Sequence, residues 1–315
     1  MTVGADQFIL APLRGVTGRV FRNTLADTFE APDEAVAPFI PTFAGERVKP
    51  ALLSDVDRSL EQRIRVIPQV IGKDPAQLAI LLRAFRAMGH TRVDLNAGCP
   101  WPFVVKKGRG AGLLADETAL EAMLAVGCEV MPEGFSVKVR LGVKTADLLA
   151  RRMELLNRYP LREVTIHPRT AKQMYEGAVD EARFAEAAAL CRHPVVYNGD
   201  IRSFADWRRL KARFPQVSRW MIGRGLAANP ALMESIRAGE DRPFPEDRMR
   251  GFLEAYLLAT GEELSGRASV LGRMKELWSY LAASFADGDR LWACVKLCRT
   301  VDEYRRVLDR IGGSR

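Results

Sequence analysis

The chain has 315 residues, 48% of them hydrophobic and 27% charged, which is typical of a globular protein and excludes a disordered or fibrous one. It contains no run of about 18 apolar residues and no signal-peptide pattern, so we expect a cytoplasmic protein that does not contact a membrane. Five cysteines, an odd number, favour free thiols over a disulfide framework. The formal net charge of +8 is compatible with a polyanionic partner but does not require one.

Short runs of apolar and β-branched residues predict eight strands. They are Phe8–Leu10, Ala35–Ile40, Val66–Ile71, Arg92–Asn96, Ser136–Arg140, Glu163–His167, Val195–Asn198 and Trp220–Ile222. Helical patterns lie between them, and the two clearest begin after Asp74 and after Ser203, which can cap the first turn of a helix. Eight strands alternating with helices over about 240 residues predict an α/β fold, a parallel (β/α)8 TIM barrel.

The pattern changes after Arg237. Pro243 and Pro245 interrupt a link rich in Gly, Asp and Glu, and no strand pattern follows it. Apolar spacing within residues 252–258, 271–281 and 291–308 predicts at least three amphipathic helices. We therefore predict two domains, a catalytic barrel over residues 1–242 and a C-terminal all-helical bundle over residues 243–315.

Residues 200–225 form a densely basic stretch. Its basic members are Arg202, Arg208, Arg209, Lys211, Arg213, Arg219 and Arg224, and its acidic members are Asp200 and Asp206. A solvated helix face and a nucleic-acid contact both explain such a stretch.

Polar residues and turn residues cluster at the carboxyl ends of the predicted strands, where the active site of a (β/α)8 barrel lies. In chain order these positions are Ala11-Pro12-Leu13, Gln69, Asn96 with Cys99, Lys138 with Arg140, His167 with Arg169, Asn198-Gly199-Asp200 and Gly223-Arg224-Gly225. Positions that only pack a barrel core would carry Val, Leu or Ile instead. We therefore expect these segments to form one site.

Two kinds of segment in this set suggest an anionic ligand. The turns at Gly199 and Gly223 follow the last two strands, where barrels commonly bind a phosphate through backbone N–H groups, and Arg224 could add charge; ordinary turn chemistry is the alternative. Lys138 and Arg140 alternate with apolar residues and so point to one side of their strand. Inside a barrel this pair requires an anion, whereas on a solvent-facing strand it would not.

Cys99 follows a strand and precedes a loop that runs through Lys106 and Lys107. An accessible basic loop favours a reactive thiol, although free cysteine is commonly a small buried hydrophobe. His167 is either a structural hydrogen-bonding residue or a ligand contact. Cys294 and Cys298 have helical spacing that favours packing over metal binding, so we predict no metal site.

At these residues the sequence resembles the tRNA-dihydrouridine synthases, along essentially the whole chain. Asn96-Ala97-Gly98-Cys99-Pro100 matches the family signature around its proton-donating cysteine. The flavin-binding positions that match are the turn Ala11-Pro12-Leu13, Gln69, Lys138, His167, and the phosphate-binding turns Asn198-Gly199-Asp200 and Gly223-Arg224. Residues 272–281 are similar to a helix of the bacterial branch that modifies uridine 16.

The resemblance implies FMN as cofactor, NADPH or NADH as reductant, and tRNA as partner. It implies that a uridine, with position 16 of the D loop as the candidate, becomes 5,6-dihydrouridine when flavin N5 passes hydride to C6 and Cys99 protonates C5. Asn96 and Arg140 would hold the polar edge of an extruded uracil, by analogy with base-flipping enzymes. Contacts with tRNA would come from Lys106, Lys107, Arg273, Lys275 and Lys296.

Three prolines depart from the family pattern, Pro38, Pro102 and Pro168. Pro102 stands where many members carry a lysine, and Lys106 or Lys107 could supply the missing contact. Two rival functions stay open, a flavin dehydrogenase for a small pyrimidine and a noncatalytic RNA-binding protein that keeps the barrel as a scaffold. Nothing in the sequence implies a protein partner, and we expect a monomer.

Overall fold

A computed structural model describes residues 6–45, 48–264 and 266–311. The strand segments pair in parallel throughout one sheet. They are β1 (Gln7–Leu10), β2 (Glu34–Val36), β3 (Ile40–Pro41), β4 (Arg65–Ile67), β5 (Gln69–Ile71), β6 (Val93–Ala97), β7 (Phe135–Gly142), β8 (Val164–Thr170), β9 (Val195–Tyr197) and β10 (Arg219–Ile222).

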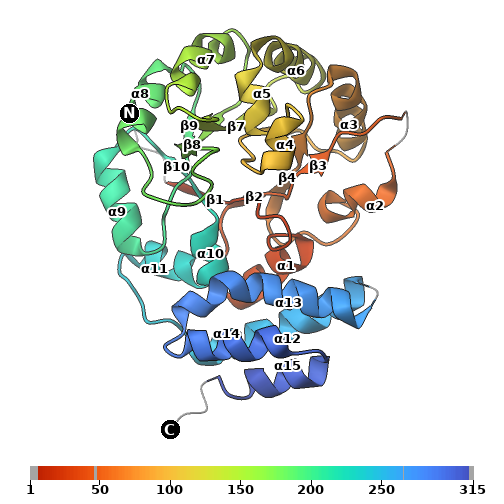
Figure 1. Cartoon of the computed structure of the whole chain (residues 1–315), viewed down its shortest axis with the longest axis vertical. Helices are drawn as coiled ribbons and strands as arrows, with labels where there is room; N and C mark the ends of the chain where they lie inside the picture. Colours follow the sequence, from red (N-terminus) through yellow and green to blue (C-terminus); the bar gives the residue numbers. More distant parts are fainter. Residues whose placement is uncertain (1–5, 46–47, 265, 312–315) are drawn as a thin grey trace.

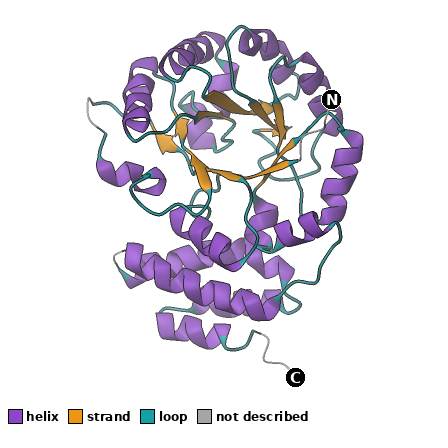
Figure 2. Cartoon of the chain, turned by 180° about the vertical axis from the view of Figure 1, so that it is seen from behind, coloured by secondary structure: helices purple, strands orange, loops and turns teal. Residues whose placement is uncertain are grey.

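The sheet closes into a barrel (Figure 2). The strand order is β3-β5-β6-β7-β8-β9-β10-β1-β2-β4. The last strand, β4, continues along the chain into β5 at the start of the order, so the sheet closes on itself. Pro68 separates β4 from β5 because proline has no N–H to donate to the ladder. β2 and β3 are likewise parts of one run and pair with β4 and β5 respectively. The result is the predicted barrel of eight parallel runs, each of which coincides with a predicted strand.

Helices surround the barrel (Figure 1). They are α1 (Arg19–Thr28), α2 (Pro50–Leu53), α3 (Pro75–Ala87), α4 (Pro102–Lys106), α5 (Ala111–Ala115), α6 (Glu117–Val130), α7 (Leu148–Asn157), α8 (Glu181–Leu190), α9 (Phe204–Arg213), α10 (Arg224–Ala228) and α11 (Leu232–Ala238). The short α4 lies over the open face of the barrel. The predicted caps form, because Asp74 accepts from the Gln77 N–H at 3.1 Å and Ser203 accepts from the Asp206 N–H at 3.0 Å.

The C-terminal helices lie side by side against one edge of the barrel (Figure 1). They are α12 (Glu246–Glu263), α13 (Arg267–Leu281), α14 (Gly288–Leu297) and α15 (Val301–Leu308). The predicted segment 291–308 is two helices, because Thr300 caps a new one with a reciprocal capping box. Phe21 of α1 packs edge-on against Phe252 and Tyr256 of α12, both at 5.9 Å between ring centroids. One hydrophobic core therefore continues from the barrel into these helices, and the domain boundary at residue 242 stays a prediction.

Buried ion pairs close the amino-terminal end of the barrel. Glu34 lies 2.5 Å from Arg92 and 2.7 Å from Arg219, and Glu163 lies 3.2 Å and 2.8 Å from the same two arginines. Burial alone would raise the pKa of Glu34, but the arginine partners outweigh it and lower that pKa. These four residues stand at or just before strand starts, so the network ties four strands together at the end of the barrel opposite the predicted site.

No helix in the part of the chain that the structure describes is both long and apolar enough to cross a membrane.

Candidate active site

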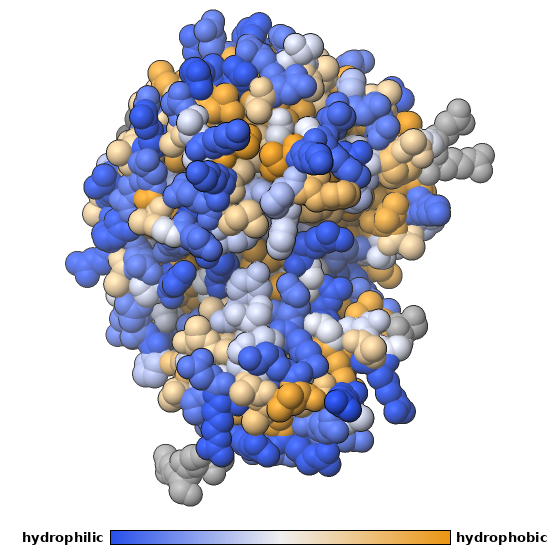
Figure 3. Space-filling model, in the orientation of Figure 1, coloured by the Kyte–Doolittle hydropathy of each residue, from blue (hydrophilic) through white to orange (hydrophobic). Residues whose placement is uncertain are grey.

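A cavity of about 600 Å³ lies at the carboxyl ends of the strands, within the usual size range of small-molecule sites. Figure 3 shows hydrophilic side chains around the hollow in the middle of the face on which α4 and α13 lie. The cavity brings together nearly all of the predicted cofactor and substrate residues, namely Ala11, Pro12, Leu13, Asn96, Cys99, Lys138, Arg140, His167, Asn198, Gly199, Asp200, Gly223 and Arg224. Gln69 is fully buried in the barrel behind this lining.

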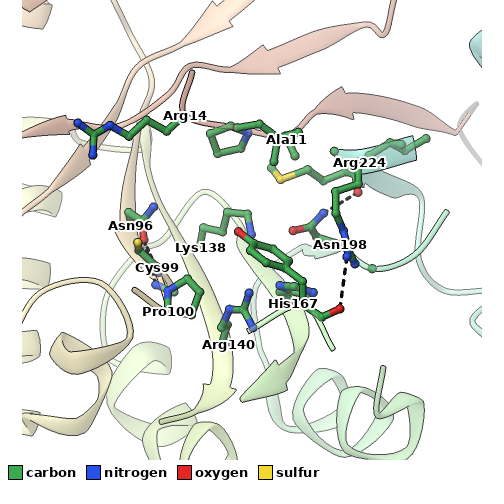
Figure 4. Close-up of a pocket in the computed structure, with 18 of the residues that line it drawn as sticks. Ala11, Arg14, Asn96, Cys99, Pro100, Lys138, Arg140, His167, Asn198 and Arg224 are labelled. Atoms are coloured by element: carbon green, nitrogen blue, oxygen red, sulfur yellow. Dashed lines mark hydrogen bonds between the residues drawn. The ribbon is translucent and has the colours of Figure 1, made fainter. Parts of the chain in front are cut away.

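Cys99 lies at one side of the cavity, two residues beyond β6 (Figure 4). Its backbone N–H donates to Asn96 Oδ1 at 2.8 Å, and the Gly98 N–H donates to the same oxygen at 3.1 Å. Gly110 packs so closely that a Cβ there would lie 2.8 Å from the Cys99 Cβ, and its φ of +56° also favours glycine. The backbone around the thiol is thus held from two directions.

The thiol of Cys99 is buried, at 7% exposure, although its side chain lines the cavity. Burial raises the pKa of this thiol and outweighs the opposing effect of nearby Lys138 and Arg140. The segment after Cys99 is exposed, as predicted, but the Cys99 side chain is not, and the raised pKa favours the protonated thiol over an activated thiolate.

A chain of hydrogen bonds, each donated inward, leads from the Cys99 backbone to Asp94 in the barrel interior. Gln69 Nε2 donates to Asp94 Oδ2 at 2.7 Å, and Asn96 Nδ2 donates to Gln69 Oε1 at 2.9 Å. Ser136 donates to the other oxygen of Asp94 at 2.9 Å. Burial raises the pKa of Asp94 to about 6. Because Gln69 and Asn96 both serve this chain, their predicted contacts with flavin and uracil stay predictions.

Lys138 and Arg140 of β7 both line the cavity, as their alternation predicts (Figure 4). Lys138 is half-buried and has no hydrogen-bond acceptor among the described residues, and burial, followed by the charge of Arg140, lowers the pKa of its ammonium to about 8. Burial also lowers the pKa of Arg140 to about 10. Arg140 donates to the carbonyls of Thr170 and Met174 at 2.9 and 2.6 Å, which ties β7 to the segment after β8.

His167 is a neutral side chain within β8, which continues to Thr170, beyond the predicted end of the strand at His167. Burial, followed by several positive neighbours, lowers its pKa well below the usual value. Its Nε2 lies 3.2 Å from Arg169 Nη1, and since a guanidinium only donates, Nε2 accepts and the ring proton is on Nδ1. His167 can therefore donate a hydrogen bond from Nδ1. Whether His167 is a structural residue or a ligand contact stays open.

The two glycine turns meet at the other side of the cavity from Cys99 (Figure 4). Asn198 Nδ2 donates to the Met221 carbonyl at 2.8 Å, which joins the turn after β9 to β10. Gly225 allows the close approach, because a Cβ there would lie 2.0 Å from the Ile201 carbonyl oxygen. Asp200 forms ion pairs with Arg169 and with Arg224, the latter at 2.6 Å. Asp200 therefore fixes the positions of the Arg169 and Arg224 guanidinium groups beside this turn.

Several residues of the cavity lining are absent from the sequence prediction. Tyr175 comes from the segment after β8, and its ring centroid lies 5.2 Å from Arg140 Cζ and 4.9 Å from Arg224 Cζ. Glu276 and Tyr280 come from α13 of the helical region. No strand-end pattern marks these positions, because the fold brings them to the cavity from other elements. Arg14, Trp101 and Phe103 also line the cavity and stand next to predicted motifs, which could have pointed to them.

The segment after Cys99 is not the predicted loop, because it contains the short helices α4 and α5. Pro102 occupies the first helical turn of α4, where its fixed φ and missing N–H are tolerated. Lys106 and Lys107 are exposed on α4 or at its end. They stand beyond the cavity lining, and their contact with tRNA stays a prediction.

The other predicted tRNA contacts lie on the helical region. Lys275 donates to the carbonyls of Lys296 and Cys298 at 2.9 and 2.8 Å, so it stabilises the end of α14. Lys296 Nζ lies 5.4 Å from the ring centroid of Trp292. Arg273 lines a second, smaller hollow between α1, α12 and α13. The contacts of Arg273, Lys275 and Lys296 with tRNA stay predictions.

Acidic partners neutralise most of the basic stretch at residues 200–225. Arg209 and Arg213 pair with Glu181, Lys211 pairs with Asp6, and Arg219 joins the network at the amino-terminal end of the barrel. These partners come from elsewhere in the sequence, so local composition overstates the free charge. This pairing favours the interpretation of the stretch as part of the folded surface over that of a nucleic-acid contact.

Among the residues that the structure describes, no group of three or more His, Cys, Asp or Glu side chains could hold a metal ion.

Comparisons with known proteins match the chain along most of its length. The family model described as "Dihydrouridine synthase (Dus)" matches residues 9–303. The tRNA-dihydrouridine(16) synthase of Cupriavidus necator is 28% identical, covering 98% of each chain, and that of Salmonella typhimurium is 27% identical, covering 96% of this chain and 98% of the relative. A solved structure of morphinone reductase in complex with tetrahydroNAD superimposes with a TM-score of 0.54 at 12% identity, covering 77% of this chain and 90% of that one. The old yellow enzyme from Trypanosoma cruzi gives a TM-score of 0.53 at 11% identity, with 77% and 91% covered.

Proposed function

Because the chain belongs to the dihydrouridine synthase family, we propose that it reduces a uridine of tRNA to 5,6-dihydrouridine with bound FMN, NADPH as reductant and Cys99 as proton donor. The observation that carries this proposal is the placement of a thiol with a raised pKa in the same cavity as an excess of positively charged side chains. The thiol supplies an acid, and the cations require an anionic ligand.

The residues of the cavity fit a flavin nucleotide. Lys138 lacks an acceptor among the described residues, so a ligand oxygen or an anionic ring would relieve the cost of burying its charge. Arg224 and the turns at Gly199 and Gly223 lie at the far side from Cys99 and would hold the phosphate. His167 Nδ1 and the turn at Ala11–Leu13 would contact the ring system. When bound and reduced, the flavin supplies a hydride for C6 of the uracil.

Cys99 donates the proton that completes the reduction. Addition of hydride at C6 leaves negative charge at C5 and its carbonyl, and the Sγ proton moves to C5 while the sulfur becomes a thiolate. The raised pKa of the thiol keeps the proton available at neutral pH. Asn96 and Gly110 hold the backbone at Cys99, so they fix the direction of the donor.

The tRNA must present the uridine as an unpaired, extruded nucleotide, because the thiol lies inside a cavity. Arg140 would bind the polar edge of the uracil, with the free Asn96 N–H as a second donor. We assign tRNA binding to residues 243–315, with Arg273, Lys275 and Lys296 as contacts, and to Lys106 and Lys107. The names of the relatives make position 16 of the D loop the candidate target.

The experiment is reconstitution of the purified protein with FMN, NADPH and unmodified tRNA, followed by mapping of dihydrouridine at each position. We expect dihydrouridine in the D loop at position 16. NADH in place of NADPH tests the reductant, and free uridine in place of tRNA tests the small-pyrimidine alternative. A colourless protein that binds tRNA without forming dihydrouridine would contradict the proposal.

A further inference from the structure

Two large aromatic side chains stand exposed where the cavity opens. Trp101 is 59% exposed and Phe103 is 71% exposed, and both contribute to the lining of the cavity that contains Cys99. Burying such side chains would stabilise a fold by about 1.5–3 kcal/mol each, so folding alone does not explain their exposure. Neither ring has a role in the chemistry proposed above.

The backbone fixes where these rings stand relative to Cys99. The Trp101 carbonyl accepts from the Val104 and Val105 N–H groups at 2.9 and 3.0 Å, and Pro102 restricts the first turn of α4. The Ala111 N–H donates to the Cys99 carbonyl at 3.0 Å and ties the far end of the segment back to the thiol. A ligand that stacks on these rings is therefore held at a defined distance from the reacting atom.

The charges beside the rings are free, unlike those of the basic stretch. Arg14, Lys106 and Lys107 are exposed, and in the described part of the chain none of them lies within ion-pair distance of a carboxylate. Lys107 Nζ lies 4.1 Å from the centroid of the Phe103 ring, so an ammonium and an aromatic face are presented together. Flat apolar rings next to unpaired cations suit the bases and phosphates of an unpaired polynucleotide.

We propose that Trp101 and Phe103 form a stacking subsite for unpaired nucleobases next to the target uridine, with Lys106 and Lys107 on the neighbouring phosphates. The inference rests on the proposed function and extends it from the reacting base to its neighbours. Residues two apart on a helical turn do not face the same direction, so the two rings contact different bases. Stacking accepts any base, so the subsite contributes affinity and placement of the strand.

The test uses the full-length flavin-bound protein and two substitutions in one chain, Trp101→Ala with Phe103→Ala. Because two stacked bases are lost, we expect KM for tRNA and Kd for a single-stranded D-loop RNA each to rise about 30-fold or more. We expect kcat at saturating tRNA, the flavin spectrum, and tRNA-free oxidation of NADPH with oxygen as acceptor to stay at wild-type values. The conservative pair Trp101→Phe with Phe103→Tyr is expected to restore most of the affinity.

Leu190→Ala is the matched control, because Leu190 is 48% exposed at the end of α8, outside the cavity. Unchanged KM and Kd in the double alanine variant overturn the subsite while leaving the proposed function intact. A wild-type protein whose RNA affinity depends on the two rings but which forms no dihydrouridine overturns the proposed function alone. A wild-type dimer that the double variant dissociates also overturns the inference, since the rings would then cover a protein interface.

Discussion

At the amino-terminal end of the barrel, Glu34 and Glu163 meet Arg92 and Arg219 at distances between 2.5 and 3.2 Å. Two carboxylates and two partly buried guanidinium groups balance there without any ligand, and the largely exposed Arg65 lies 3.5 Å from Glu34 as a further partner. At the carboxyl end, the cavity lining is unbalanced, with five cations against two carboxylates.

These lining cations are Arg14, Lys138, Arg140, Arg202 and Arg224, and the carboxylates are Asp200 and Glu276. Burial, followed by the neighbouring cations, lowers the pKa values of Lys138 and His167, whereas the arginine partners at the balanced end lower the pKa of Glu34. Balanced charge at the closed end of the barrel contributes to the stability of the fold, whereas unbalanced charge around the cavity costs stability and is retained for a ligand. The predictions below test this division.

The largest effect is expected at the unbalanced end, from Cys99→Ala. Loss of a positioned general acid lowers kcat for dihydrouridine formation by about 10²- to 10⁴-fold. Flavin absorbance and tRNA affinity are expected to stay unchanged, because the thiol binds neither cofactor phosphate nor RNA backbone in our proposal. Single-turnover formation of dihydrouridine measures the effect, and a variant that keeps more than about a tenth of the wild-type rate would refute the role of Cys99.

At the balanced end, Glu163→Gln removes one carboxylate from between Arg92 and Arg219, which are mostly shielded from solvent and are left with too little negative charge. We expect the free energy of unfolding to fall by about 3 kcal/mol, as for other broken buried pairs. Urea denaturation measures this change. The turnover of the folded fraction is expected to match wild type, which is the opposite pattern to Cys99→Ala.

Glu117→Gln is the control for this variant, because the Glu117 side chain is 52% exposed in its pair with Arg152. Exposed pairs contribute little, so its unfolding curve is expected to stay near that of wild type. Equal losses of unfolding free energy in the two variants would mean that the network at the amino-terminal end stabilises the fold no more than an exposed ion pair does.

Lys138→Met tests whether the unbalanced end costs stability. Removing a half-buried ammonium that lacks an acceptor among the described residues is expected to stabilise the flavin-free protein by about 1 kcal/mol. The same change is expected to weaken FMN binding about 10- to 100-fold, because a charged contact is lost. Thermal unfolding of the flavin-free protein and fluorescence titration with FMN give the two values.

Lys144→Met removes an exposed lysine just beyond β7 and is expected to change neither quantity. If Lys138→Met instead destabilised the flavin-free protein, the ammonium would be serving the fold.

The smallest effect is a dependence of FMN affinity on pH. The folded, flavin-free protein releases the Lys138 proton near pH 8, whereas the unfolded chain keeps it until about pH 10.4. Between these values the unfolded state binds more protons, so the contribution of Lys138 to stability rises with pH. FMN affinity is expected to fall over the same range, by up to about tenfold per pH unit. Titrations at pH 7, 8 and 9 measure it, and a slope that persists in Lys138→Met would assign it to another group.

Much of the barrel could be predicted from the sequence, because buried parallel strands and amphipathic helices leave local signals. Each predicted strand coincides with an observed run, and Asp74 and Ser203 cap helices as expected. The segment after Cys99 was misread as a loop, since α4 and α5 are too short to show a helical period. The apolar spacing over residues 291–308 gave no sign of a break, although the cap at Thr300 divides this segment into two helices.

The candidate site was predictable where function follows strand ends, and Cys99, Lys138, Arg140 and His167 do share one cavity. Tyr175 was not predictable, because it reaches the cavity from beyond β8. Glu276 and Tyr280 were not predictable either, because only the packing of α13 against the barrel places them there. Asn96 and Gln69 also have a structural role that the sequence did not indicate. Asn96 donates to Gln69 and accepts from the Cys99 backbone N–H.

By itself, the sequence determined the order of strands and helices, the signature around Cys99 and the surplus of basic residues. These properties are local or additive, so they can be read without coordinates. Only the tertiary structure decided which charges are free and which thiol is buried. Ion pairs such as Arg213 with Glu181 and Lys211 with Asp6 join distant residues, and the raised pKa of Cys99 depends on surroundings that several elements supply. Burial and pairing are properties of three-dimensional neighbours, which the order of residues does not state.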